Sequence, residues 1–132
     1  MGSAGGAAGP FGVFAVIAFL LYIGAMGWTV EFLDEDVRAE LYAMPADIRA
    51  SFSRIAQLIS NTGLSRVHEP YVKHLEGSLW EMRMKGKDGI ARAVYVTAHA
   101  QRVVVVHVFQ KKTQKTPRRE IELARQRAKE VK

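Results

Sequence analysis

Cationic side chains recur at strand positions in the second half of the chain, where together they could bind a phosphate group. The set consists of Arg83, Lys85, Arg92, Lys111 and Lys112. In "LWEMRMK", strand alternation places Arg83 and Lys85 on one face with Glu81, and the tryptophan and methionines on the other. If these strands are neighbours in one sheet, the cations converge on one side of it. The alternative is an ordinary solvated sheet face whose ion pairs contribute little.

A cluster of lysine and arginine without metal ligands can support cleavage of RNA. The ribose 2′-hydroxyl is an internal nucleophile, so the protein mainly has to orient the backbone. Fixed cations then stabilise the charge that develops on the phosphorane oxygens and on the leaving oxygen. DNA lacks this hydroxyl, so such a site would act only on RNA.

Other kinds of chemistry lack the residues that they need. The chain has no cysteine, which removes disulfides, thiolate nucleophiles and cysteine-based zinc sites. Its histidines do not have metal-ligand spacing: His68, His74, His99 and His107. A phosphate-cradling glycine loop, a dinucleotide fingerprint and a nucleophile elbow are all missing from the sequence. We therefore expect no metal site and no cofactor.

The elements that must position these residues predict a small α+β domain. "WTVEFL" (28–33) is typical of a strand, and two helical patterns follow, the first capped by Asp34 and the second starting near Pro45. Gly63 suits the end of the second helix. The segment 64–77 looks irregular.

The second half of the domain is predicted to be a sheet followed by a last helix. "LWEMRMK" and "IARAVYVTA" form a hairpin around "GKDG", with Trp80 expected in the core beside the methionines. The run of four valines from Val103 indicates a central strand covered on both faces. Thr116 and Pro117 signal the N-cap and first turn of the last helix. The order β-α-α-β-β-β-α predicts a mostly antiparallel sheet with helices packed mainly on one face.

The N-terminal segment differs from the rest of the chain. Residues 1–30 carry no charge, and Phe11 to Gly27 is long enough to suggest a membrane span. No linker separates this run from the strand at 28–33, so a spanning helix would have to become a sheet strand at the membrane surface. This steric argument favours the interpretation that residues 1–27 are a dispensable leader, with a functional start near Met26. Residues 28–132 are then the domain. The minority interpretation is membrane association through residues 11–27.

The positive charge lies almost entirely at the C-terminal end. The net charge is +6, and residues 101–132 hold ten Lys and Arg against three Glu, so that segment alone is +7. Such asymmetry favours an anionic partner such as nucleic acid, an acidic protein or a membrane surface, or else a solvated basic helix.

Several motifs in a fixed order resemble a known family. They are "KHLEG", "LWEMR" and, above all, "KKTQKTP" after a valine-rich strand, followed by "EIELARQRAKE". From about Trp28 to its C-terminus the chain resembles the HigB branch of the RelE-like toxins of bacterial type II toxin–antitoxin systems, also known as phage-derived Gp49-like proteins. The resemblance implies a RelE-like fold and a metal-independent, ribosome-associated mRNA endoribonuclease that acts in the cytoplasm. It also implies a helix-turn-helix antitoxin of the HigA kind as partner.

The resemblance also implies site residues. Positions that bind or stabilise RNA phosphate in these toxins are matched by Arg83, Arg92, Lys111 and Lys112. Further RNA contacts are expected from Lys85, Lys115, Thr113 and Arg118. Thr116 belongs to the same motif, but we expect it mainly to cap the last helix.

The general base is left open, because RelE carries a catalytic tyrosine after its basic motif and "TQKTPRRE" contains none. His74, beside Lys73 in the segment that looks irregular, is one candidate catalytic residue. His107, Tyr95 and Glu81 are weaker candidates, since His107 and Tyr95 are expected to be core residues. A different class of function stays open as well: a non-catalytic basic module that binds RNA or an acidic protein.

Overall fold

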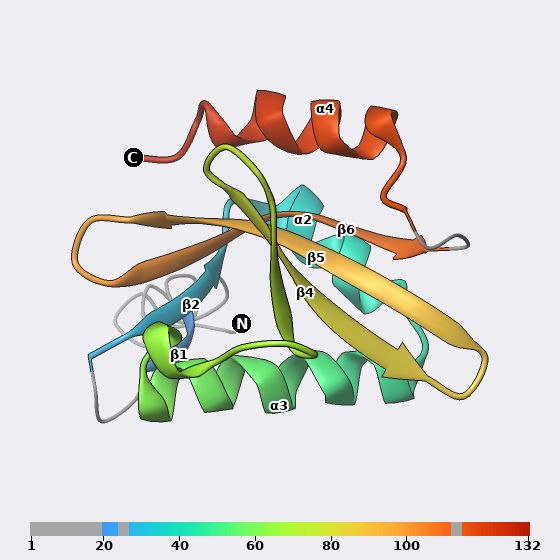
Figure 1. Ribbon diagram of the computed structural model, residues 1–132, viewed down its shortest axis with the longest axis horizontal. Helices are drawn as coiled ribbons and strands as arrows, with labels where there is room; N and C mark the ends of the chain where they lie inside the picture. Colours follow the sequence, from blue (N-terminus) through green and yellow to red (C-terminus); the bar gives the residue numbers. More distant parts are fainter. Residues whose placement is uncertain (1–19, 24–26, 112–114) are drawn as a thin grey trace, which may run out of the picture.

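The computed structural model of the 132-residue chain describes residues 20–23, 27–111 and 115–132, with side chains described from residue 27 onward (Figure 1). The strands are β1 (Leu20–Ile23), β2 (Thr29–Phe32), β3 (Val72–Glu76), β4 (Leu79–Gly86), β5 (Gly89–Ala98) and β6 (Arg102–Lys111). The helices are α2 (Glu35–Tyr42), α3 (Ala46–Thr62) and α4 (Arg118–Ala128), with a short 3₁₀ helix, η2 (Leu64–Arg66).

The described strands form one sheet in the order β1-β2-β6-β5-β4-β3. Only the β2–β6 pair is parallel, and the other neighbours are antiparallel. The β4–β5 hairpin turns at Lys87 and Asp88, as "GKDG" predicts, because Gly86 pairs with Gly89. The predicted α+β class with a mostly antiparallel sheet is therefore confirmed.

Local signals in the sequence set the ends of the first two helices. The side chain of Asp34 accepts a hydrogen bond of 3.0 Å from the backbone N–H of Val37 and so caps α2. Pro45 occupies the N-cap position of α3. Gly63 ends that helix at a φ of +89°, a left-handed conformation that glycine adopts without strain.

The central strand β6 is covered on both faces, as its valines predict. Val103 and Val105 belong to a core with α2 and α3, whereas Val104 and Val106 belong to a second core with α4. Figure 1 shows α3 and α4 on opposite sides of the sheet. Two of the three α-helices in the described residues thus pack on one face, as expected, and α4 covers part of the other.

The segment 64–77 is regular where the sequence looked irregular. It contains η2 and the edge strand β3, in which Val72 lies opposite Met82 and Lys73 opposite Glu81. The strand β3 is not recognisable in the sequence, because Val72 at its start is its only buried residue and the strand shows no apolar alternation. Its partner β4 supplies the hydrogen bonds that hold it extended.

The apolar N-terminal segment is described only in part. Leu20–Ile23 forms β1, which pairs antiparallel with β2. Within the described part of the chain, no helix combines the length and the apolar character needed to cross a membrane. Residues 1–19 and 24–26 lie outside the described residues, so the leader interpretation of residues 1–27 stays a prediction.

Candidate phosphate-binding cleft

A cleft of about 840 Å³ lies on the α4 side of the sheet, between β3, β4, the end of β6 and the start of α4. Its lining includes five basic side chains: Lys73, Arg83, Lys111, Lys115 and Arg118. Two carboxylates, Glu76 and Glu81, also line it. The excess of cations makes the cleft suited to an anion.

Both carboxylates of the cleft are engaged by arginines. Glu76 on β3 receives two hydrogen bonds from Arg118, of 2.9 and 3.1 Å, and is also paired with Arg125. Glu81 on β4 pairs with Arg92 of β5. These pairs offset the negative charge of the lining, so the positive field of Lys73 and Arg83 is not cancelled by the acids beside them.

The face of β4 that carries Glu81 and Arg83 is not the wet surface expected from its polar residues. Glu81 is only 3 % exposed and Arg83 is half-buried, while Lys85 near the end of the strand is exposed. Thr116, just before α4, covers Glu81 and donates a hydrogen bond of 3.0 Å from its hydroxyl to the Glu81 carboxylate. The alternative of an ordinary solvated sheet face does not describe Glu81, because Thr116 packs over it.

Thr116 does not cap the last helix. Pro117 holds the N-cap position of α4, and the helix has no side-chain cap. The hydroxyl of Thr116 points to Glu81 instead. The expected capping role of Thr116 is therefore wrong, and the reason is tertiary: a buried carboxylate needs a donor more than a partly exposed helix end does.

Arg92 lies behind the cleft rather than in its wall. Its side chain is buried, with 1 % of the residue exposed, and its Nε lies 3.4 Å from the Glu81 carboxylate. Nε and Nη1 have no hydrogen-bond partner among the described residues. Burial lowers the pKa of Arg92, and the nearby charge of Glu81 opposes that effect. In this position Arg92 contributes charge to the cleft without touching its contents.

Lys111 ends β6 at the floor of the cleft and is largely buried. Burial lowers the pKa of its ammonium group, and the positive charges of Arg92 and Arg83 lower it further, whereas Glu81 acts in the opposite direction. A lysine of lowered pKa can exchange protons nearer neutral pH than an ordinary lysine.

His74 is at the cleft's edge on β3, and its ring is already engaged. Its Nε2 lies 2.8 Å from the carbonyl oxygen of Gly77, which it reaches as a donor, and its ring meets Trp80 edge-on at 5.0 Å. Trp80 is 39 % exposed, so its predicted place in the core is wrong.

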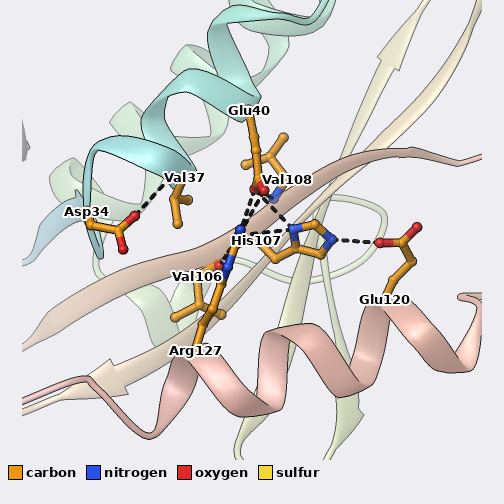
Figure 2. Close-up of polar contacts among 8 residues, drawn as sticks. All are labelled: Asp34, Val37, Glu40, Val106, His107, Val108, Glu120 and Arg127. Atoms are coloured by element: carbon orange, nitrogen blue, oxygen red, sulfur yellow. Dashed lines mark hydrogen bonds and ion pairs between the residues drawn. The ribbon is translucent and has the colours of Figure 1, made fainter.

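His107 lies outside the cleft, at the junction of β6, α2 and α4 (Figure 2). Its Nδ1 is 3.0 Å from Glu40 and its Nε2 is 2.7 Å from Glu120, so both ring nitrogens face carboxylates. Arg127 of α4 also reaches Glu40. Burial by itself would lower the pKa of His107, but the hydrogen bonds to the two carboxylates raise it above its ordinary value. The two carboxylates favour the charged imidazolium as a structural cross-link, although Nη1 of Arg127 lies 3.3 Å from Nδ1 and opposes that charge.

The structure brings together part of the predicted site. Arg83, Lys111, Lys115, Arg118, His74 and Glu81 all line the cleft. Lys85 is not in that lining, and Tyr95 lies in the other core, where burial raises the pKa of its phenol. Lys112 and Thr113 lie outside the described residues. Across the described residues no cluster of histidine and acidic side chains is suited to hold a metal ion.

Sequence reasoning missed Lys73. It lies opposite Glu81 on β3 and adds a cation to the cleft wall. Strand alternation would have placed it on the side of Arg83 had β3 been recognised, because residues directly opposite in an antiparallel pair share a face.

Comparison with known proteins identifies the family of the chain. The family model described as "Phage derived protein Gp49-like" matches residues 39–129, from the middle of α2 to just past α4. This range includes every described residue that lines the cleft. No curated protein matches the chain. The expected family is confirmed: the chain belongs to the phage-derived Gp49-like family, a family associated with toxin–antitoxin systems.

Proposed function

We propose that this protein is the toxin of a type II toxin–antitoxin system and that it cleaves mRNA on the ribosome without a metal ion. The observation that carries the proposal is the cleft in which Lys73, Arg83, Lys111 and Lys115 face one space while Glu76 and Glu81 are engaged by arginines. Family membership supplies the toxin–antitoxin context. Action on ribosomes places the protein in the cytoplasm.

The proposed reaction is an internal transesterification of the RNA backbone. The ribose 2′-oxygen attacks the adjacent phosphorus, the new O2′–P bond forms, and the P–O5′ bond breaks to leave a cyclic phosphate and a 5′-hydroxyl. Arg83 and the lysines of the cleft would hold the phosphate and stabilise the charge on the non-bridging oxygens. A fork of donors such as the Arg83 guanidinium suits two oxygens of one phosphate.

Two protons must move in this reaction, one from the 2′-hydroxyl and one to the 5′-oxygen. Lys111 is our candidate for a proton-transfer group, because its lowered pKa brings it nearer to the working pH and it lies in the cleft. His74, the other candidate from the sequence, is less suited, because its ring packs against Trp80 and its Nε2 donates to Gly77.

The test compares cleavage of a translated mRNA by wild-type protein and by cleft variants in a purified ribosome system. Arg83→Ala and Lys111→Ala should each reduce the cleavage rate by about 10²–10³-fold, the usual loss when one charge-stabilising group is removed. Arg54→Ala is the matched control, since Arg54 is exposed on α3, across the sheet from the cleft. A 2′-deoxy nucleotide at the cut site should block cleavage.

Metal independence needs a separate arm, because ribosomes require magnesium. Cleavage should persist with a transition-metal chelator such as phenanthroline while magnesium is kept constant. Cleavage that is unchanged in both cleft variants would reject the site, and tight RNA binding without any cleavage would instead support a non-catalytic RNA-binding module.

The partner is tested by expression in cells. Induction of the chain should arrest growth, and co-expression of a neighbouring gene for a small helix-turn-helix protein should restore it. Arrest that is not relieved by such a gene would argue against the proposed antitoxin.

A further inference from the structure

We propose that Glu81 is a positioning residue that fixes Lys115 at the cleft through the neighbouring Thr116. The proposal rests on the proposed function for its catalytic consequence, but the anchor itself is a geometric claim. One carboxylate oxygen of Glu81 accepts the hydroxyl of Thr116 at 3.0 Å, and the other lies 3.4 Å from Nε of Arg92. Three segments thus meet at one side chain: β4, β5 and the start of α4.

A carboxylate at this place calls for a physical reason. Glu81 and Arg92 have side chains only 4 % and 2 % exposed, and burying two charges costs more than an exposed pair would. A negative charge in the lining of the cleft also weakens its attraction for phosphate. Pairing with Arg92 accounts for one oxygen of Glu81, because Arg92 would otherwise be buried without a counter-charge, but it does not account for the other oxygen, which accepts the Thr116 hydroxyl.

The position of Thr116 in the chain supplies the reason. Thr116 follows Lys115, and both line the cleft together with Lys111 at the end of β6. Because the Thr116 hydroxyl is held by Glu81, the place of Lys115 is fixed relative to Arg83, which lies two residues along the same strand as Glu81. The anchor therefore sets the spacing of cations that come from separate elements.

Glu81 also acts on the charges around it. It opposes the lowering of the Lys111 pKa that burial and Arg92 cause. Loss of the Glu81 charge should therefore lower the pKa of Lys111 further. The pH dependence of any activity that relies on the protonation state of Lys111 should then shift to lower pH.

The first experiment removes the hydroxyl of Thr116 with little change of shape. Thr116→Val should lower single-turnover cleavage by roughly 10–100-fold, because misplacement of a catalytic group by about 1 Å has effects of that size. Thr116→Ser keeps the hydroxyl and should stay within about threefold of wild type. Thr97→Val, at an exposed threonine of β5, is the matched control and should change nothing. A Thr116→Val protein as fast as wild type, or a Thr116→Ser protein as slow as Thr116→Val, would overturn the role of the hydroxyl.

The second experiment reads the anchor without catalysis. Under native conditions trypsin should cut after Lys115 several-fold faster in Thr116→Val than in wild type, Thr116→Ser or Thr97→Val, as measured by mass spectrometry. Equal rates in all four proteins would refute the anchor even if RNA is cleaved. Faster cutting in Thr116→Val would support it even if the chain proves to have no nuclease activity, so the two proposals fail separately.

A third arm uses Glu81→Gln, which keeps the size of the side chain and removes its charge. If it folds, the acidic limb of its pH–rate profile should move to lower pH than in wild type. An unmoved limb would reject the electrostatic part of the proposal. If it does not fold, the Thr116 variants still decide the anchor.

Discussion

Replacing Glu40 with alanine should destabilise the domain by about 3 kcal/mol, because this carboxylate joins three elements. Glu40 lies on α2 and accepts hydrogen bonds from the backbone N–H of Val108 at 2.9 Å and from His107 at 3.0 Å, both on β6. Arg127 of α4 reaches it at 2.9 Å (Figure 2).

The magnitude follows from what alanine would leave behind. An unsatisfied buried N–H costs about 1–3 kcal/mol, and a hydrogen bond to a charged group contributes about 1.5–3 kcal/mol. The Glu40 side chain is 24 % exposed, so water can replace part of these interactions and the sum falls toward the lower end. For a domain of this size, about 3 kcal/mol corresponds to a fall in Tm of roughly 12 °C or more.

The assay is urea and thermal unfolding followed by circular dichroism at neutral pH. Glu40→Gln should lie between wild type and Glu40→Ala, because it keeps an acceptor for the Val108 N–H and loses the charge. Glu35→Ala is the matched control on the same helix, since Glu35 is 61 % exposed and pairs only with Arg38 among the described contacts. It should change stability by less than about 0.5 kcal/mol. If Glu40→Ala is no less stable than Glu35→Ala, the reasoning is wrong.

Three further predictions concern pH, packing and RNA binding. The pKa of His107 is raised in the folded protein above its ordinary 6.5, so the stability that its charge contributes is complete below pH 6.5 and is lost as pH rises through the higher folded value. Urea unfolding from pH 6 to 9 should therefore show a steeper loss of stability in wild type than in His107→Gln. Equal slopes would contradict the charged cross-link. Gly86→Ala should lower the free energy of unfolding by about 1–3 kcal/mol, because the added Cβ would lie 2.8 Å from an oxygen of Asp47 that already accepts the Lys87 N–H. An unchanged Tm in thermal unfolding would mean that α3 shifts without cost. Lys73→Ala should weaken binding of a non-cleavable RNA and reduce the slope of log affinity against log salt by about one, whereas an unchanged slope would place Lys73 away from the phosphate.

Local sequence signals predicted much of the fold, and their failures have a common cause. Asp34 and Gly63 were read correctly because capping depends on the residue itself and its immediate neighbours. The strand β3 was missed because its hydrogen bonds come from β4, and the exposed side of an edge strand leaves no apolar period. Trp80 was misplaced because alternation gives the face on which a residue lies but not how much of that face is covered.

The sequence by itself determined the family, the α+β class and the concentration of positive charge around residues 111–119, because motifs, periodicity and charge are properties of the chain. Only the tertiary structure decided which cations share one space. Lys73 lies in the cleft wall, and Arg92 is buried behind Glu81. Thr116, expected to cap a helix, instead donates a hydrogen bond to the buried Glu81 carboxylate. These outcomes depend on which strands are neighbours and on where α4 packs, and both are decided by contacts between different elements, such as the bond between Thr116 and Glu81.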